Sequence, residues 1–98
     1  MAAWVYILKC RDGSYYTGCT TDIDRRYGQH VSGTFGGYTS TRLPVEMVWA
    51  AEFQDVRDAI DYERRLKRWS RAKKEAVIRQ DWDALPELSA RGFRPAAR

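Results

Sequence analysis

The sequence predicts an α+β domain whose three-stranded, mostly antiparallel sheet is flanked by helices. Three observations predict it: two aromatic and β-branched runs joined by a short turn near the start, a third such run near the middle, and apolar residues at helical spacing between and after them. With 98 residues the chain can form one hydrophobic core but not two. We therefore expect one domain over residues 1–80, followed by a C-terminal turn and a mobile tail over residues 81–98.

A β-hairpin is predicted over residues 4–19. Its strands are the runs at residues 4–8 and 14–17, and a loop of three residues that ends in Gly13 separates them. A glycine at this place suits a type I turn followed by a left-handed residue that forms a bulge. A two-residue turn at Asp12 and Gly13 is the alternative, and it would shift the pairing of the strands by one residue.

The type of turn decides where two tyrosines lie. The bulged turn pairs Tyr6 with Gly18, so that the rings of Tyr6 and Tyr16 share one face of the sheet and an open space remains beside Tyr6. The shifted pairing would put the two rings on opposite faces. We prefer the bulged turn.

A helix over residues 21–31 directs polar side chains at the sheet. One face of this helix carries four residues at the spacing i, i+3, i+4 and i+7, namely Ile23, Arg26, Tyr27 and His30. Since the isoleucine and the tyrosine must pack on the sheet, Arg26 and His30 point there too. A buried arginine is costly unless it meets a carboxylate or a bound anion.

The second half of the predicted domain begins with a long loop over residues 32–42, which is rich in glycine, serine and threonine. Ordered loops of this length in small domains tend to be functional. The remaining elements are a strand over residues 45–53, helices over residues 55–68 and 71–79, and a short turn that uses Trp82 and Leu85.

One acidic residue, Glu63, falls in the apolar stripe of the predicted helix over residues 55–68. The stripe is marked by four apolar residues: Val56, Ala59, Ile60 and Leu66. A salt bridge between Glu63 and Arg26, with His30 as an ordinary core residue, is one interpretation. Because three polar side chains would point at one core surface that also carries the two tyrosines, we favour a functional site on the sheet face beneath the first two helices.

Positive charge is concentrated in one segment. The net charge of the chain is +4, but residues 64–79 hold eight basic side chains against the single acid Glu75. A basic segment on an otherwise slightly acidic domain is typical of proteins that bind phosphate backbones. We expect Arg68, Arg71 and Lys74 to contact nucleic acid, and a solvated helix face is the alternative.

Several classes of protein are excluded. No stretch approaches the roughly 18 apolar residues of a membrane span, and the N-terminus lacks the features of a signal peptide, so a cytoplasmic protein without membrane contact is expected. Cys10 and Cys19 would lie too far apart for a disulfide in the predicted hairpin. One histidine and the lack of a Cys-x-x-Cys spacing exclude a zinc site. No oligomeric state is predicted.

The order of these residues resembles the GIY-YIG nuclease family, and it is closest to the small stand-alone bacterial branch with a single domain. The resemblance covers about residues 4–79 and rests on Val5-Tyr6, Tyr16-Thr17-Gly18 and the polar residues that follow. It implies roles for seven residues: Tyr6 and Tyr16 as the signature tyrosines, Arg26 and His30 as further catalytic groups, Glu63 as the single metal-binding carboxylate, and Tyr38 and Arg42 as parts of a Tyr-Thr…Arg-x-Pro element that binds nucleic acid.

The resemblance implies a metal-dependent endonuclease that hydrolyses phosphodiester bonds of DNA, in repair or recombination. Glu63 would hold one Mg²⁺ or Mn²⁺ weakly, Arg26 would bind the phosphate, and a tyrosine or His30 would act as general base. The chain departs from the family triplets at Trp4 and Thr17, which replace a glycine and an isoleucine. Two alternatives stay open: a nucleic-acid-binding module with the same fold and little or no catalysis, and an interaction protein with a buried salt-bridge network.

Overall fold

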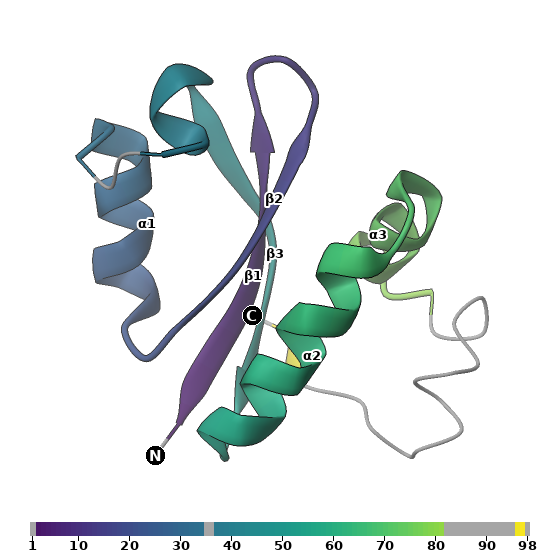
Figure 1. Ribbon diagram of the computed structural model, residues 1–98. Coiled ribbons are helices and arrows are strands. Elements are labelled where there is room, and N and C mark those ends of the chain that lie inside the picture. Colours follow the sequence, from purple (N-terminus) through teal and green to yellow (C-terminus); the bar gives the residue numbers. More distant parts are fainter. Residues whose placement is uncertain (1, 35–36, 82–95, 98) are drawn as a thin grey trace.

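Four strands form one antiparallel sheet in the computed structural model, which describes residues 2–34, 37–81 and 96–97. The strands are β1 (Ala3–Cys10), β2 (Tyr15–Thr20), β3 (Val45–Phe53) and β4 (Ala96–Ala97). Their order across the sheet is β2-β1-β3-β4 (Figure 1). The three longer strands are those that the sequence predicts, whereas the two-residue strand β4, which pairs with β3, was not predicted.

The hairpin of β1 and β2 has the predicted bulged turn. The backbone N–H of Cys10 donates to the carbonyl of Ser14 (2.9 Å), and the N–H of Gly13 donates to the carbonyl of Cys10 (2.9 Å). Gly13 has a φ of +84°, a conformation that glycine adopts without the steric penalty of other residues. The resulting register pairs Tyr6 with Gly18, so the bulged turn is confirmed and the shifted alternative is wrong.

Three α-helices and one 3₁₀ turn complete the described residues. They are α1 (Ile23–Ser32), the 3₁₀ turn η1 (Thr39–Thr41), α2 (Val56–Arg68) and α3 (Arg71–Ile78). Asp22 caps α1 by accepting from the backbone N–H of Arg25 (3.1 Å). Ser70 caps α3 in the same way, by accepting from the backbone N–H of Lys73 (3.3 Å).

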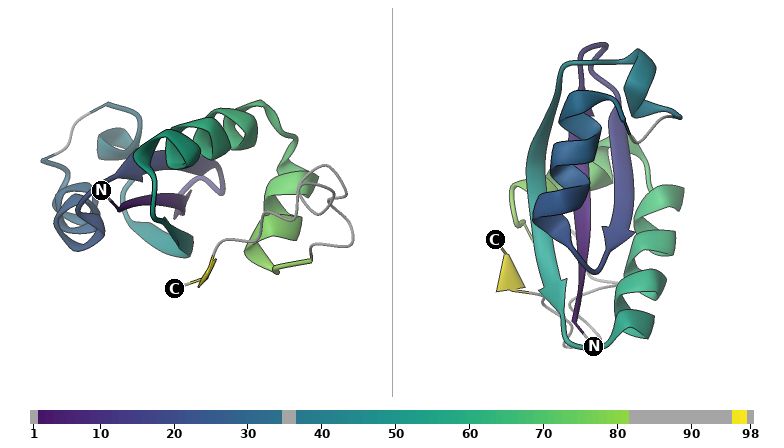
Figure 2. Two further views of the ribbon diagram at one scale, coloured as in Figure 1. Left: turned by 90° about the horizontal axis from the view of Figure 1, so that it is seen from below. Right: turned by 90° about the vertical axis from the view of Figure 1, so that its left-hand side faces the viewer.

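The helices cover opposite faces of the sheet. α1 lies on one face and α2 lies on the other, with α3 beyond it (Figure 1; Figure 2). Because successive side chains of a strand point to opposite faces, β1 contributes Tyr6 and Leu8 to the core beneath α1. Val5 and Ile7 of the same strand enter the core beneath α2 and α3. The expectation that the first two helices share a face is wrong, since periodicity identifies the buried side of a helix but not the sheet face that it covers.

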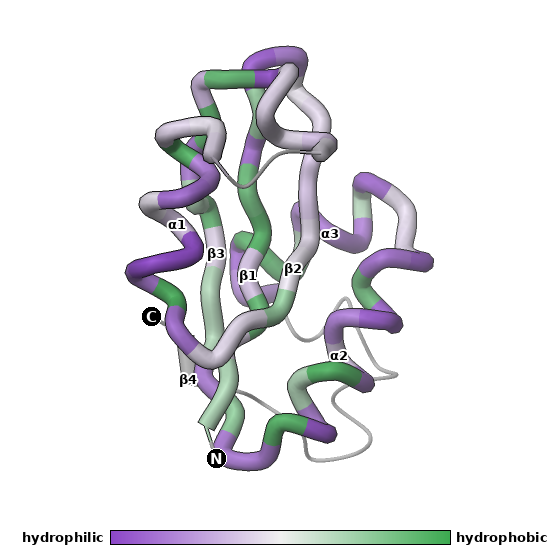
Figure 3. Tube along the Cα trace, turned by 60° about the vertical axis from the view of Figure 1, so that its left-hand side comes forward, coloured by the Kyte–Doolittle hydropathy of each residue, from purple (hydrophilic) through white to green (hydrophobic). Residues whose placement is uncertain are grey.

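The hydropathy of the chain follows this layering. β1, between its two neighbouring strands, consists mostly of hydrophobic residues, whereas α1 consists mostly of hydrophilic ones (Figure 3). Only two residues of α1, Ile23 and His30, are fully buried. The contact between α1 and the sheet is therefore narrow, and one of its two buried side chains is polar.

Helix α2 packs through a different stripe from the predicted one. Its buried residues are Ala59, Tyr62 and Leu66, whereas Ile60 is 38% exposed. The ring of Tyr62 lies 5.1 Å from that of Phe53, measured between centroids, and a buried aromatic ring removes more apolar surface from water than an isoleucine does. The charged residue Glu63 consequently lies at the margin of the stripe, with 18% of its side chain exposed.

Three further predictions concern the tail, the cysteines and membranes. The predicted turn at Trp82 and Leu85 and most of the tail lie outside the described residues. Cys10 and Cys19 are both free thiols. Among the helices of the described ranges, none combines the length and the apolar character that a bilayer crossing requires.

Candidate active site

A buried series of hydrogen bonds joins three elements beneath α1. The hydroxyl of Tyr6 on β1 lies 2.9 Å from Nε2 of His30 on α1, and Nδ1 of His30 lies 2.8 Å from Oγ1 of Thr39 in η1. Tyr6 and His30 are fully buried, and Thr39 is 1% exposed. Because these side chains are buried from water, their polar atoms depend on hydrogen-bond partners within the protein.

The protonation of this series follows from burial. Burial lowers the pKa of His30, and the nearby charge of Arg26 lowers it further, so the imidazole is neutral near pH 7. Burial also raises the pKa of Tyr6 to about 12, although a hydrogen bond from Arg26 opposes the shift. Because Arg26 donates to the Tyr6 oxygen, we assign the Tyr6 hydroxyl as the donor, and Nε2 of His30 as the acceptor, of the hydrogen bond between them. The Nδ1–H then donates to Thr39.

Tyr16 and Gly18 place a second tyrosine beside this series. The ring centroid of Tyr16 lies 6.3 Å from that of Tyr6 and 5.2 Å from that of His30. A Cβ at Gly18 would overlap the ring end and the hydroxyl of Tyr6. The open space predicted beside Gly18 is therefore filled by the Tyr6 ring, and only glycine fits at this position.

Arg26 and Glu63 act on the same two tyrosines from helices on opposite sides of the sheet. Burial raises the pKa of Tyr16, while the charge of Arg26 lowers it and that of Glu63 raises it further. The same two charges act on Tyr6. Because β2 is an edge strand, a carboxylate on α2 can approach the tyrosines around that edge. The fold thus gathers Tyr6, Tyr16, Arg26 and His30 beneath α1, and Glu63 lies near enough for its charge to act on both tyrosines.

Glu63 is the candidate ligand for a divalent cation. Its carboxylate lies 3.7 Å from Nζ of Lys67 and remains partly accessible. No group of three or more His, Cys, Asp and Glu side chains converges within the part of the chain that the structure describes. A cation held by one carboxylate keeps most of its waters, as Mg²⁺ commonly does, so these residues fit a weakly held ion.

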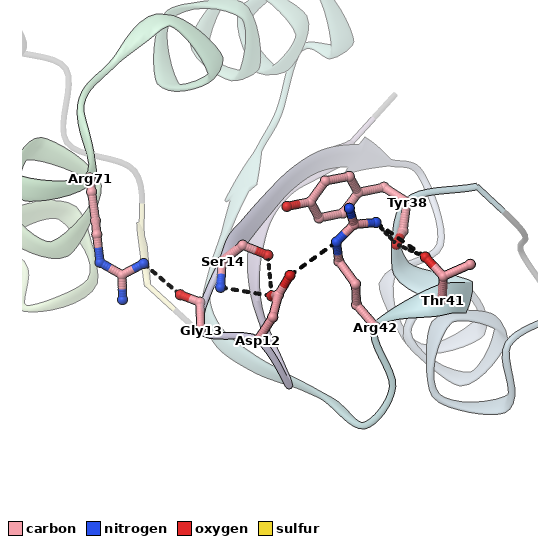
Figure 4. Close-up of polar contacts among 7 residues, drawn as sticks. All are labelled: Asp12, Gly13, Ser14, Tyr38, Thr41, Arg42 and Arg71. Carbon is pink, nitrogen blue, oxygen red and sulfur yellow. Dashed lines mark hydrogen bonds and ion pairs between the residues drawn. The ribbon is translucent and has the colours of Figure 1, made fainter.

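The loop after α1 places Tyr38 and Arg42 next to the tyrosines. The ring of Tyr38 lies 6.2 Å from that of Tyr16 at an interplanar angle of 28°, and Cζ of Arg42 lies 3.7 Å from the centroid of the Tyr38 ring. Arg42 donates from Nε to Asp12 (3.1 Å), and from Nη1 to the carbonyl of Tyr38 (2.9 Å) and to Oγ1 of Thr41 (3.1 Å; Figure 4). Arg42 thus fastens the loop to the hairpin turn.

Arg71 of the basic segment has structural contacts on the opposite face of the sheet. Its guanidinium donates to the carbonyl of Gly13 (Figure 4). It also lies 4.6 Å from the centroid of the Tyr15 ring and pairs with Glu75 of the same helix (3.5 Å). Tyr15 precedes Tyr16 on β2 and therefore points away from the tyrosine cluster. Arg71 joins α3 to the hairpin turn, and the structure does not bring it to the tyrosines.

Arg68 and Lys74 differ from Arg71 and from each other. Arg68 is exposed in the last turn of α2. Lys74 is half-buried, and burial, followed by the charge of Lys67, lowers its pKa. Both stay candidates for contacts with nucleic acid.

Two residues of this network were not predicted as hydrogen-bond partners, although Thr39 belongs to the Tyr-Thr…Arg-x-Pro element of the sequence. Thr39 holds the histidine, and Asp12 holds Arg42. Both lie in segments that the sequence marks as a long polar loop and a turn, but neither residue type nor spacing shows which atom they bind. The first hydrogen bond depends on how the loop folds back onto α1 and the second on how it meets the hairpin turn, and both are tertiary properties.

Comparison with known proteins defines the class of protein. The GIY-YIG catalytic domain matches residues 2–76, which is most of the chain. The chain therefore belongs to the GIY-YIG family, a family of nucleases, as the resemblance of its sequence predicted.

Several relatives carry the name UPF0213 protein. The UPF0213 protein of Streptococcus pneumoniae serotype 4 is 44% identical over 81 residues, which cover 83% of this chain and 82% of the relative. The UPF0213 protein VNG_2274C of Halobacterium salinarum is 44% identical over 74 residues, which cover 76% of this chain and 96% of the relative. These names state no activity.

Solution NMR structures of similar proteins share the fold. UPF0213 protein BH0048 from Bacillus halodurans is 44% identical, with a TM-score of 0.56 over 82% of this chain and 85% of that chain. Protein EF2693 from E. faecalis is 36% identical, with a TM-score of 0.58 over the same shares of the two chains. The predicted α+β fold class is confirmed.

Proposed function

We propose that the chain is a metal-dependent endonuclease that hydrolyses phosphodiester bonds of DNA, with a role in repair or recombination. The observation that carries the proposal is the hydrogen-bonded series of Tyr6, His30 and Thr39 with Arg26 and Tyr16 beside it. Membership of a nuclease family that typically acts on DNA supports it.

Tyr6 and His30 activate the attacking water in this proposal. Since burial raises the pKa of Tyr6 to about 12, its phenol is protonated at neutral pH and a free phenolate is not the resting base. The Tyr6 oxygen accepts a proton from water while its own hydroxyl proton passes to Nε2 of His30, which its lowered pKa keeps unprotonated. The hydroxide attacks phosphorus, the bond from phosphorus to the 3′ oxygen breaks, and that oxygen takes up a proton from solvent.

The remaining residues hold the imidazole and the phosphate. Thr39 accepts from Nδ1–H and so fixes the tautomer in which Nε2 carries no hydrogen and can receive the proton. Arg26 supplies a planar guanidinium that matches the geometry of two phosphate oxygens. Glu63 would hold the divalent ion, which when bound polarises the phosphate. The ammonium group of Lys67 near Glu63 competes with the ion, in agreement with weak binding.

A nucleic-acid-binding module with little catalysis is the second candidate. The raised pKa of Tyr6 favours this candidate, because the hydroxyl keeps its proton at neutral pH. Tyr6 can then accept a proton from water only if His30 takes the hydroxyl proton in the same step. Glu63 is not part of any group of three or more possible metal ligands within the described residues, which points the same way.

A cleavage panel separates these functions. The purified chain is incubated with labelled branched DNA, damaged duplex, single-stranded DNA and RNA, with and without Mn²⁺. The proposal predicts Mn²⁺-dependent cleavage of DNA that is absent in Glu63→Ala. Binding that weakens with salt, without cleavage of any substrate, would select the binding module, and no binding at all would select the interaction protein.

A further inference from the structure

We propose that Tyr38 and Arg42, fastened to the hairpin turn by Asp12, form a seat for one unpaired nucleobase beside the phosphate that is cleaved. The inference rests on the proposed function and adds the substrate class: a nucleic acid that presents an unstacked nucleotide at the cleavage position. Single strands, loops and flipped nucleotides belong to this class, and a fully stacked duplex does not.

Hydrogen bonds within the protein hold the seat in place. Three hydrogen bonds fix the guanidinium of Arg42 over the Tyr38 ring, and the backbone N–H of Arg11 donates to the carbonyl of Arg42 (3.0 Å). Both side chains remain accessible: Tyr38 is 42% exposed, and 34% of the Arg42 side chain is exposed. A platform that is held in place loses little conformational entropy when a ligand stacks on it.

Its charge suits a base better than a phosphate. Hydrogen bonds from the side chain and backbone of Ser14, followed by that of Arg42, lower the pKa of Asp12, so this carboxylate is ionised near pH 7. The pair of Asp12 and Arg42 then carries no net charge and attracts a phosphate weakly. A guanidinium plane and an aromatic ring still stack with the face of any nucleobase.

Its position ties the seat to the proposed chemistry. Tyr38 lies 6.2 Å from Tyr16, and Tyr16 lies 5.2 Å from His30, between ring centroids. A base on Arg42 and Tyr38 therefore belongs to a nucleotide that flanks the phosphate at the tyrosines. In a duplex both faces of each base are covered by its neighbours, so a nucleotide must leave the stack to reach this seat.

A fluorescence experiment tests the seat without cleavage. Single-stranded oligonucleotides that carry 2-aminopurine at successive positions are titrated with the Glu63→Gln protein, since stacking quenches this base. We expect quenching at one position, with weaker binding to the duplex of the same sequence. Arg42→Lys, which keeps the charge but not the plane, should abolish the quenching and weaken binding about tenfold, with the slope of log affinity against log salt unchanged.

Matched variants and outcomes make the test decisive. Tyr38→Phe keeps the aromatic ring and should keep the quenching, whereas Tyr38→Leu should lose it. Arg57→Lys, in the first turn of α2, is the control and should behave as the parent protein. Thermal melts confirm that each variant is folded. Quenching that survives both Arg42→Lys and Tyr38→Leu, or a slope flattened by about 0.7 in Arg42→Gln, would overturn the seat. If the Glu63→Gln protein quenches the base but the wild type cleaves no substrate with Mn²⁺, the proposed nuclease function is overturned and the seat is kept. Cleavage by the wild type, with no quenching at any labelled position, would overturn the seat and keep the nuclease function.

Discussion

The hydroxyl of Tyr6 lies 2.9 Å from Nε2 of His30, and neither side chain is exposed. Tyr6 belongs to the strand between β2 and β3, whereas His30 lies in the last turn of α1. Two buried polar groups that satisfy one another are stable together, but removal of one leaves the other without its partner. Substitutions at this pair therefore report on the fold and on the proposed chemistry at once.

Tyr6→Phe should lower the free energy of unfolding by about 1–3 kcal/mol, because it removes the buried partner of Nε2. Cleavage should fall by about 10²–10⁴-fold if the hydroxyl passes the proton from water to His30. Tyr15→Phe is the matched control, since the hydroxyl of Tyr15 donates to Glu75 (3.1 Å) on the other face. Chemical denaturation and a cleavage assay on the three proteins give both quantities, and full activity in Tyr6→Phe would exclude the relay.

Gly18→Ala should destabilise the protein by about 1–3 kcal/mol, because its new methyl group would meet the Tyr6 ring in a closely packed core. Gly28→Ala, in α1, adds the same methyl group where no atom lies within 4 Å. It should stabilise the helix by about 0.5–1 kcal/mol. The two melting temperatures should therefore move in opposite directions, and an unchanged melting temperature in Gly18→Ala would show that the ring can move aside.

Acidification should destabilise the fold through His30. Its folded-state pKa is lowered, chiefly by burial, so the unfolded chain binds the proton more readily. The stabilisation is complete above the unfolded pKa of about 6.5 and is lost as the pH falls below it towards the folded value. Between pH 7.5 and 5.5 the melting temperature of the wild type should fall more steeply than that of His30→Gln. Parallel curves would contradict a buried neutral imidazole.

Arg68 and Arg71 should respond differently to removal. Arg68→Ala should leave the melting temperature unchanged and flatten the slope of log affinity against log salt for duplex DNA by about 0.9, if Arg68 contacts a phosphate. Arg71→Ala should lower the melting temperature, because it removes the hydrogen bond that joins α3 to Gly13 and the ion pair with Glu75 inside the helix. Arg57→Ala serves as the control, and an unchanged slope in Arg68→Ala would make this surface a solvated face.

The elements of the fold could be predicted from the sequence because their signals are local. A glycine that ends a three-residue loop determined the turn, and the turn determined that Tyr6 and Tyr16 share a face. The spacing of Ile23 and His30 likewise indicated the buried side of α1. These are properties of neighbouring residues, and the structure agrees with each of them.

The errors arose where several packing solutions were possible. The periodicity of α2 allowed either Ile60 or Tyr62 to face the sheet, and contacts of Tyr62 with two aromatic rings on β3 decided it. Nothing local indicated that α1 and α2 take opposite faces. Thr39 gained its partner only when the loop folded back onto α1, and Asp12 only when the loop met the hairpin turn. No spacing in the sequence records either contact.

The central claim is that Glu63 serves metal-dependent cleavage and is not a structural partner of Arg26. The measurement that tests it most directly is cleavage of labelled DNA with Mn²⁺ by the wild type and Glu63→Gln, with the thermal melt of each protein and Glu46→Gln as the control on β3. We predict that Glu63→Gln loses cleavage by several orders of magnitude, because the ion loses its charged ligand, while its melting temperature is unchanged or slightly higher. A large loss of stability, of about 3–5 kcal/mol as expected for a stranded buried cation, or cleavage equal to that of the wild type, would contradict the claim.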